Sequence, residues 1–394
     1  MRILMTIHHY KILDAGAPGA TLLLARALNE QGHEVSVFGF EDFKAANAGP
    51  LTQMTFPWFL AAQPRRIMMY DVIDASTGDG HVLYPLFRTL FRKQRPLLVT
   101  RCHGLEHLAH VRRRMDAKLG RDRLTWKYPI YHGGLRLHEV ARSLRSADLS
   151  LFLNEDDRSY ATQRLHVSRT KTKVLPAGID GAFLEHAVDM KSARNSGPHI
   201  VWMGSWIPRK APDIASTVIT AFLRRDPTRQ AHFLGTGVPD DRILAMLPSE
   251  VHAQVSITST YVRADLPSIF RPLDILLFPS RSEGFPVTVL EAMACGLTPI
   301  LSAIPAVSSF AQHGVNALLA PLDAADSFES FVETLMANHA LRLRIATSAM
   351  ATARSLSWAT VANRTAQTYA EVSEERTAAI RRDRTSNAQF RHMC

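Results

Sequence analysis

Short apolar segments alternate with longer helical stretches along this chain of 394 residues, and the alternation starts twice. This pattern is typical of doubly wound α/β domains built on parallel sheets. The first set of predicted strands covers residues 2–7, 34–38, 72–75, 97–100, 149–153 and 173–175, with a helix at 20–31. The second set covers residues 199–203, 231–234, 255–257, 275–278 and 298–301. A polar stretch at 189–198 separates the two sets and is the predicted domain boundary.

The string from Ser282 to Gly296, SEGFPVTVLEAMACG, follows a predicted strand and carries the clearest chemistry in the sequence. Pro286 suits the first turn of a helix, and Gly296 suits the C-terminal cap. Glu283 and Glu291 are eight residues apart, which is roughly 12 Å along a helix and close to the span from hexose to ribose in a nucleotide sugar. A helix N-terminus between them can hold a diphosphate. Two carboxylates at this spacing are also common on a solvated helix face.

The string resembles the donor-site signature of the family-four (group 1) retaining glycosyltransferases of the GT-B fold. This resemblance implies an α/β fold with two Rossmann-like doubly wound domains facing a central cleft. It also implies that Glu283 orients the sugar hydroxyls and that Glu291 accepts hydrogen bonds from the ribose. The donor-binding residues of the string are then Gly284, Phe285, Pro286, Val287 and Glu291.

The resemblance extends over roughly residues 1–372 and divides the chain into four parts. Residues 1–190 are predicted to form the acceptor-side domain and residues 191–355 the donor domain. Residues 356–375 correspond to a helix that crosses back to the first domain. The basic tail at 376–394 lacks apolar periodicity and is predicted to be disordered.

A second donor element follows the predicted strand at 199–203. Gly204 allows the backbone to approach a ligand closely, while Arg209 and Lys210 together can neutralise a diphosphate. The family resemblance gives this basic pair a catalytic role. The family often has Arg directly after the glycine and Gly directly after the lysine, whereas this chain has Ser205 and Ala211 at these positions. Two exposed basic residues in a turn are the structural alternative.

Two further candidates lie in the first half of the chain. The family usually has paired glycines after the first strand, and Gly16 matches the second of them while Ala15 replaces the first. A plain turn glycine remains the alternative for Gly16. His103 follows the predicted strand at 97–100, where the family frequently carries a histidine near the transferred sugar. A structural histidine is the alternative there, and Glu106 is a weaker candidate on the acceptor side.

Neither a metal site nor a cofactor is expected. No Asp-x-Asp pair occurs near the donor elements, and Asp79 and Asp156-Asp157 are interpreted as surface turns. The three cysteines, Cys102, Cys295 and Cys394, have no spacing suited to a metal or to a disulfide framework. The nucleotide-diphosphate sugar is therefore expected as a co-substrate, with no further cofactor.

Composition and charge suggest a compartment and a second partner. The N-terminus reads as a strand and not as a signal peptide, and no apolar run reaches the roughly 20 residues of a membrane span. We therefore expect a cytoplasmic protein. Of the net charge of +10, residues 101–145 carry +7, with Trp126, Tyr128 and Tyr131 interspersed. This segment is either a solvated basic helix pair or a surface for anionic lipid at the inner face of a membrane.

The predicted function is a retaining hexosyltransferase that uses a nucleotide-diphosphate sugar and a glycan or lipid-linked acceptor in cell-surface polysaccharide synthesis. One alternative is a GT-B protein that binds sugar nucleotides without transfer. The family's glycine-glycine-x-x-Glu element is replaced here by Ala303-Ile304-Pro305-Ala306-Val307-Ser308, which lacks the acidic residue. The other alternative is a basic nucleic-acid-binding protein, which is disfavoured because no domain signature supports it.

Overall fold

The computed structural model describes residues 1–43, 47, 49–91, 94–185 and 198–392, with side chains up to residue 382. The chain divides into two compact units. Unit 1 consists of Met1–His110, Thr125–Pro176 and Trp358–Cys394, and unit 2 consists of Val111–Leu124 and Ala177–Ser357. The main body of unit 2 begins at Ala177, and the predicted boundary at 189–198 lies almost wholly outside the described residues.

Unit 1 contains a six-stranded parallel sheet in the order β2-β1-β3-β4-β5-β6. Its elements are β1 (Arg2–Thr6), α1 (Gly16–Glu30), β2 (Glu34–Phe38), α2 (Pro50–Ala61), α3 (Pro64–Ile67), β3 (Val72–Ser76), α4 (Gly80–Leu90), β4 (Leu97–Arg101), the start of α5 (Glu106–Lys118), η1 (Tyr131–Leu135), α6 (Arg136–Ser146), β5 (Leu149–Phe152), α7 (Glu155–Arg164), η2 (Arg169–Lys171), β6 (Thr172–Val174) and α15 (Trp358–His392). In register, Ile3 of β1 pairs with Val35 of β2 and with Val72 of β3.

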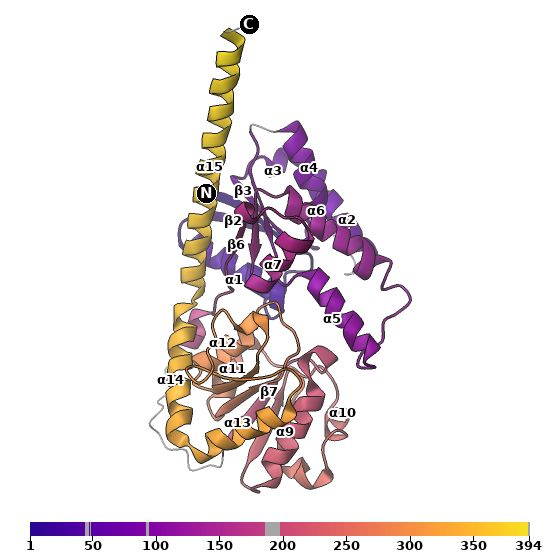
Figure 1. Cartoon of the computed structure of the whole chain (residues 1–394), viewed down its shortest axis with the longest axis vertical. Helices are drawn as coiled ribbons and strands as arrows, with labels where there is room; N and C mark the ends of the chain where they lie inside the picture. The colour runs from indigo at the N-terminus through magenta and orange to yellow at the C-terminus, as the bar shows by residue number, and fades with distance from the viewer. Residues whose placement is uncertain (44–46, 48, 92–93, 186–197, 393–394) are drawn as a thin grey trace. The chain divides into compact units, whose positions relative to one another are not determined.

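Unit 2 contains a second six-stranded parallel sheet in the order β12-β11-β10-β7-β8-β9. Its elements are α8 (Gly181–Glu185), β7 (His199–Met203), η3 (Pro208–Lys210), α9 (Pro212–Arg224), β8 (Gln230–Leu234), α10 (Asp240–Leu244), η4 (Ser249–Gln254), β9 (Val255–Thr258), η5 (Arg263–Asp265), α11 (Leu266–Phe270), β10 (Ile275–Phe278), α12 (Val287–Ala294), β11 (Thr298–Ser302), η6 (Pro305–Val307), β12 (Leu318–Ala320), α13 (Ala325–Ala337) and α14 (His339–Ser355). Figure 1 shows the helices that flank each sheet.

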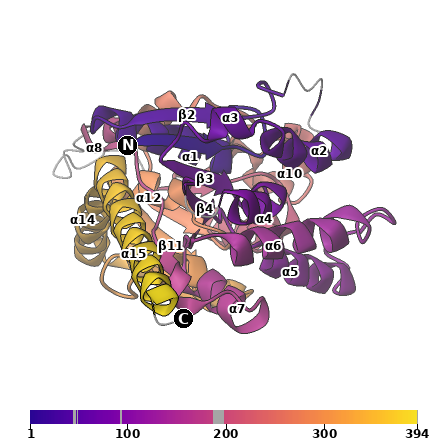
Figure 2. The same cartoon turned by 90° about the horizontal axis from the view of Figure 1, so that it is seen from above.

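Each sheet is buried on both faces, which explains why the strands read as continuous apolar runs. In β10, Leu276 and Phe278 pack with α12, whereas Ile275 and Leu277 pack with α9 and α13. In unit 1, α4 and α15 lie on opposite sides of β3 and β4 (Figure 2). The predicted α/β class with two doubly wound domains is therefore confirmed.

The predicted strands match the observed ones closely, although the short strand β12 was not predicted. At the other end of the fold, α15 continues as a helix to His392, through the tail for which disorder was predicted. Residues 376–392 contain no Gly or Pro that would end a helix, so a helix already docked on unit 1 can propagate through them.

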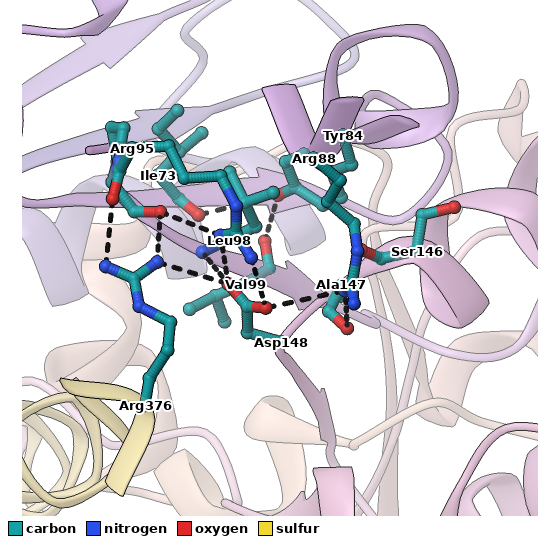
Figure 3. A network of polar contacts seen from close by, with 11 residues as sticks. Ile73, Tyr84, Arg88, Arg95, Leu98, Val99, Ser146, Ala147, Asp148 and Arg376 are labelled. Carbon is teal, nitrogen blue, oxygen red and sulfur yellow. Dashed lines mark hydrogen bonds and ion pairs between the residues drawn. The ribbon is translucent and has the colours of Figure 1, made fainter. Parts of the chain in front are cut away.

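Arg376 anchors α15 to unit 1 one residue beyond the predicted end of the helix (Figure 3). Its guanidinium donates to the carbonyl oxygens of Pro96 at 2.7 Å and Arg95 at 2.8 Å, and lies 3.5 Å from Asp148 Oδ2. Burial alone would raise the pKa of Asp148, but hydrogen bonds and charge from Arg95 hold it below its ordinary value. Asp148 therefore stays ionised between two arginines and joins the start of β4 to α15.

Candidate functional site

One carboxylate and two cations meet in unit 2 where β7 and β10 end. Arg209 and Lys210 lie in η3 after β7, and Glu283 lies in the loop after β10. Because β7 and β10 are adjacent and parallel, their carboxyl ends lie at the same edge of the sheet. Arg209 Nη1 donates to Glu283 Oε2 at 2.5 Å, and Lys210 Nζ donates to Glu283 Oε1 at 2.6 Å. The structure thus brings together three residues that were predicted from separate motifs.

Burial and charge set the ionisation of this trio. The side chains of Glu283 and Lys210 are 9% and 13% exposed, whereas that of Arg209 is 42% exposed. Burial would raise the pKa of Glu283, but the charges of Lys210 and Arg209 outweigh it and lower that pKa. Burial also lowers the pKa of Lys210, opposed by the charge of Glu283. The trio therefore carries one excess positive charge, which suits an anionic ligand.

Two small residues shape the loop that carries the cations. Gly204 has φ +146°, and a Cβ there would lie 3.1 Å from the Cδ atom of Lys210. A glycine is required because this φ is strained for other residues and the side chain of Lys210 occupies the space. Ala211, where the resembling family often has glycine, takes a left-handed φ of +52° and is fully buried. The family preference at this position thus reflects backbone conformation.

Glu291 is held by a cation that the sequence did not reveal. It lies buried on α12, and Arg263 of η5 pairs with it at 2.5 Å between Nη2 and Oε1. Burial raises the pKa of Glu291, and the charge of Arg263 opposes that rise. Only Val287–Ala294 is helical, so Glu283 precedes the helix and Pro286 occupies its N-cap position. The estimate of eight helical residues between the two carboxylates is therefore wrong.

The predicted donor-binding segment between the two carboxylates is tightly folded. The Phe285 ring packs against the core of unit 2 and meets Phe310 edge to face at 5.5 Å between ring centroids. The N–H groups of Val287 and Val289 donate to the carbonyl oxygens of Phe285 and Pro286, both at 3.0 Å. Gly284 to Val287 thus link Glu283 rigidly to α12, and their contact with a donor stays a prediction.

Gly16 and His103 belong to unit 1. His103 Nε2 lies 3.3 Å from the hydroxyl of Thr21 on α1, and burial, aided by the charge of Arg101, lowers the pKa of His103 to about 4. Gly16 begins α1, and a Cβ there would meet no atom within 4 Å. Packing in unit 1 requires Gly19 instead, where a Cβ would lie 2.1 Å from the carbonyl oxygen of Leu13. The roles of Gly16 and His103 remain predictions.

Asp79 is a buried residue and not part of a surface turn as predicted. It is fully buried after β3, accepts from the Thr6 hydroxyl at 2.5 Å and lies 2.5 Å from Nδ1 of His8. Burial lowers the pKa of His8 despite this carboxylate, so its imidazole is neutral near pH 7. The surface interpretation fails for Asp157 as well, because it is 5% exposed and accepts from the N–H of Leu105 at 3.1 Å.

The basic segment at 101–145 is only partly solvated. Arg101 is buried against Asp74 of β3, with 2.8 Å between its Nε and Oδ2 of Asp74. Arg136 is buried 3.4 Å from both Glu106 and Glu139. These two arginines form buried ion pairs within unit 1, so the interpretation as a solvated basic helix pair does not apply to them.

Comparison with known proteins finds glycosyltransferases. Residues 197–338 match the family model described as glycosyl transferases group 1. The chain is 28% identical over 304 residues to the D-inositol 3-phosphate glycosyltransferase of Nocardia farcinica, covering 68% of this chain and 66% of the relative. It is 24% identical over 232 residues to the enzyme of that name from Kineococcus radiotolerans, covering 53% of each chain. Residues 197–338 are thus similar to the group 1 glycosyltransferases, and the relatives matched over a larger part of the chain carry glycosyltransferase names.

Solved structures of GT-B glycosyltransferases have the same fold. Sucrose-phosphate synthase from Thermosynechococcus elongatus superposes with a TM-score of 0.75 at 17% identity, covering 95% of this chain and 100% of the other. Anabaena Alr3699/HepE in complex with UDP-glucose gives a TM-score of 0.67 at 18% identity, covering 94% and 100%. The chain spans only about half of the length of the relative from Kineococcus radiotolerans.

The group 1 match covers the residues that form the trio of Arg209, Lys210 and Glu283. It also covers Arg263 and Arg281, which sequence reasoning missed because a single arginine in a loop has no distinctive signature. Within the described residues, no group of three His, Cys, Asp or Glu side chains is placed to hold a metal ion. None of the described helices has the length and apolar character that a membrane span needs.

Proposed function

We propose that this protein transfers a hexose, with retention of configuration, from a nucleotide-diphosphate sugar to a hydroxyl of a glycan or lipid-linked acceptor in cell-surface polysaccharide synthesis. The proposal rests on the ionised Glu283, which lies between Arg209 and Lys210 where the adjacent strands β7 and β10 end. Anabaena Alr3699/HepE, which shares the fold, was solved with UDP-glucose. The curated relatives add D-inositol 3-phosphate to the acceptors worth testing.

The trio suggests how charge is handled during transfer. Without a donor, Glu283 pairs with both cations and leaves one positive charge in excess. A diphosphate would bind the same cations and release a carboxylate oxygen of Glu283 for the sugar hydroxyls. As the bond from the sugar to the diphosphate breaks, Arg209 and Lys210 stabilise the negative charge that grows on the leaving group. The acceptor hydroxyl then attacks the face that the leaving group vacates and gives its proton to an oxygen of the departing diphosphate. In this proposal no metal ion takes part in the step.

The test is release of nucleoside diphosphate from UDP- and GDP-hexoses by the purified protein, with and without D-inositol 3-phosphate. NMR of the product reports the anomeric configuration, and EDTA should leave the rate unchanged. Glu283→Ala should lower the rate at least about 100-fold, as expected for an electrostatic group at the reaction centre. Glu333→Ala is the matched control, because Glu333 pairs with Arg229 elsewhere in unit 2. If no nucleotide sugar is bound or consumed, the proposal fails.

The proposal includes contact of α5 with an anionic membrane surface. None of the residues of this helix is buried. Val111 and Met115 of α5 and Leu119, one residue past its end, are spaced four residues apart and are 49%, 54% and 57% exposed. Such spacing puts them on one face, and the intervening arginines and Lys118 supply positive charge. An apolar stripe beside basic residues is typical of a helix that lies at the lipid interface.

Sedimentation with lipid vesicles tests this contact. The protein should bind phosphatidylglycerol vesicles more strongly than phosphatidylcholine vesicles, and Met115→Glu should weaken binding. Met246→Glu is the control, since Met246 is 43% exposed on another part of unit 2. Equal binding to both kinds of vesicle would contradict the electrostatic contribution.

A further inference from the structure

Arg281 holds the backbone of the loop that carries the two cations of the trio. Its Nη1 donates to the carbonyl oxygen of Pro208 at 2.6 Å, and its backbone N–H donates to that of Arg209 at 2.8 Å. The Arg281 side chain is only 6% exposed. One residue therefore bonds to two successive carbonyl groups of η3.

Two carboxylates keep the guanidinium of Arg281 in place. Its Nη2 lies 2.6 Å from Asp213 Oδ2, at the start of α9, and its Nε lies 2.6 Å from Asp323 Oδ1. Asp323 adopts a left-handed φ of +60° and also accepts from Arg121 at 3.0 Å. Burial lowers the pKa of Arg281, but its bonds to Asp213 and Asp323 outweigh this effect and raise it, so the group stays charged.

The neighbouring residue holds the side chain of Arg209. Ser282 accepts at its carbonyl oxygen from Arg209 Nη1 at 2.8 Å. Arg281 thus bonds to the backbone of Arg209, while Ser282 and Glu283 both accept from its Nη1. The turn itself is only three residues long, and its N-cap residue Ile207 makes no side-chain capping bond. Apart from residues 281–283, the indole N–H of Trp202 donates to the carbonyl oxygen of Lys210 at 3.3 Å.

We propose that Arg281 is a positioning residue for the diphosphate of the donor. It fixes the path of Pro208 to Lys210 so that Arg209 and Lys210 converge on one nucleoside diphosphate, which Arg281 itself does not touch. The inference rests on the proposed function of this site. A lysine cannot replace Arg281, because the planar guanidinium reaches Pro208, Asp213 and Asp323 from separate nitrogens whereas an ammonium group presents one nitrogen.

The test compares Arg281→Lys with the matched variant Arg229→Lys. Arg229 also lies in unit 2, is 12% exposed, donates to the carbonyl oxygen of Phe222 and pairs with Glu333, each at 3.0 Å. UDP binding, measured by calorimetry, should weaken at least tenfold in Arg281→Lys and by less than twofold in Arg229→Lys. Hydrogen exchange of the amides of Lys210 and Ala211, which close the turn, should accelerate only in Arg281→Lys.

Unchanged UDP affinity in a folded Arg281→Lys protein would overturn the inference, as would an equal loss in Arg229→Lys. If the wild-type protein binds neither UDP nor GDP, the proposed function fails. The exchange measurement still decides whether Arg281 orders the turn in that case. Unchanged exchange at Lys210 and Ala211 would overturn the inference by itself. If Arg281→Lys does not fold, Asp323→Asn is the second variant, because it removes one of the two carboxylates that pair with the guanidinium of Arg281. It should weaken UDP binding and accelerate exchange of the same two amides. Unchanged UDP binding and unchanged exchange in Asp323→Asn would also overturn the inference.

Discussion

Tyr369→Phe removes one hydroxyl from the interior of unit 1 and should weaken the attachment of α15 to the sheet. Tyr369 is fully buried, and its hydroxyl donates to Asp74 Oδ2 at 2.5 Å. The same hydroxyl accepts from Arg101 Nη2 at 3.1 Å. Asp74 lies on β3 and Arg101 ends β4, so this hydroxyl connects α15 to two neighbouring strands.

The expected loss follows from these two bonds. A hydrogen bond to a charged group contributes about 1.5–3 kcal/mol to the free energy of unfolding. The ion pair between Arg101 and Asp74 survives in the variant, so no buried charge is left alone. We therefore expect a loss near the lower end for two bonds, about 3 kcal/mol. For a unit of about 150–250 residues, each kcal/mol lowers the melting temperature by roughly 2–4 °C, which predicts a shift of about 6–12 °C.

Differential scanning calorimetry of the full chain measures this shift in the transition of unit 1. Tyr70→Phe is the control, because Tyr70 is only partly buried in the same unit. Amide exchange in α15 should also accelerate in Tyr369→Phe and stay unchanged in the control. A shift below about 2 °C, or one equal to that of Tyr70→Phe, would refute the argument that these charge-assisted bonds hold the helix.

Three further outcomes are expected. Glu283→Gln should lower the melting temperature, because Lys210 loses its anionic partner. The same variant should bind UDP more tightly in calorimetry, because the diphosphate no longer competes with a carboxylate for the cations. Weaker UDP binding would contradict this expectation. Gly204→Ala should weaken UDP binding about tenfold, since a Cβ strains the backbone and displaces Lys210, and unaltered affinity would show that the loop adapts. The pKa of His103 falls to about 4 on folding, so the unfolded chain binds more protons between pH 4 and 6.5 and stability should decline as pH falls through that range. In denaturant titrations, His103→Gln should reduce this loss of unfolding free energy by on the order of 2 kcal/mol, a figure set below the full pKa effect because the ring is partly exposed. An unchanged dependence of stability on pH would rule out this contribution.

Local patterns predicted the strands, the fold class and the trio for a clear reason. Continuous apolar runs are what a sheet buried on both faces needs, and β7 and β10 were predicted with their observed bounds. Arg209 and Glu283 each lie in the segment that follows such a strand. That these residues meet follows from the adjacency of β7 and β10, which the sequence did not predict and the structure shows.

Long-range partners could not be predicted from local patterns. Asp79 was taken for a surface residue because charged side chains are rarely buried unless paired, and its partners Thr6 and His8 are 73 and 71 residues away. Arg263 and Arg281 were missed for the same reason, since Glu291 and Asp323 become their partners only after folding. The strand β12, which is only three residues long, was also missed.

The sequence by itself therefore determined the strand order along the chain, the family resemblance and the identity of the trio, because these depend on contiguous residues. Only the tertiary structure decided which charges are buried and which residues support the trio. It also decided how far α15 extends, because a helix that is docked through Tyr369 and Arg376 propagates where composition alone predicts disorder. Those outcomes depend on contacts between residues far apart in the chain, which no local pattern records.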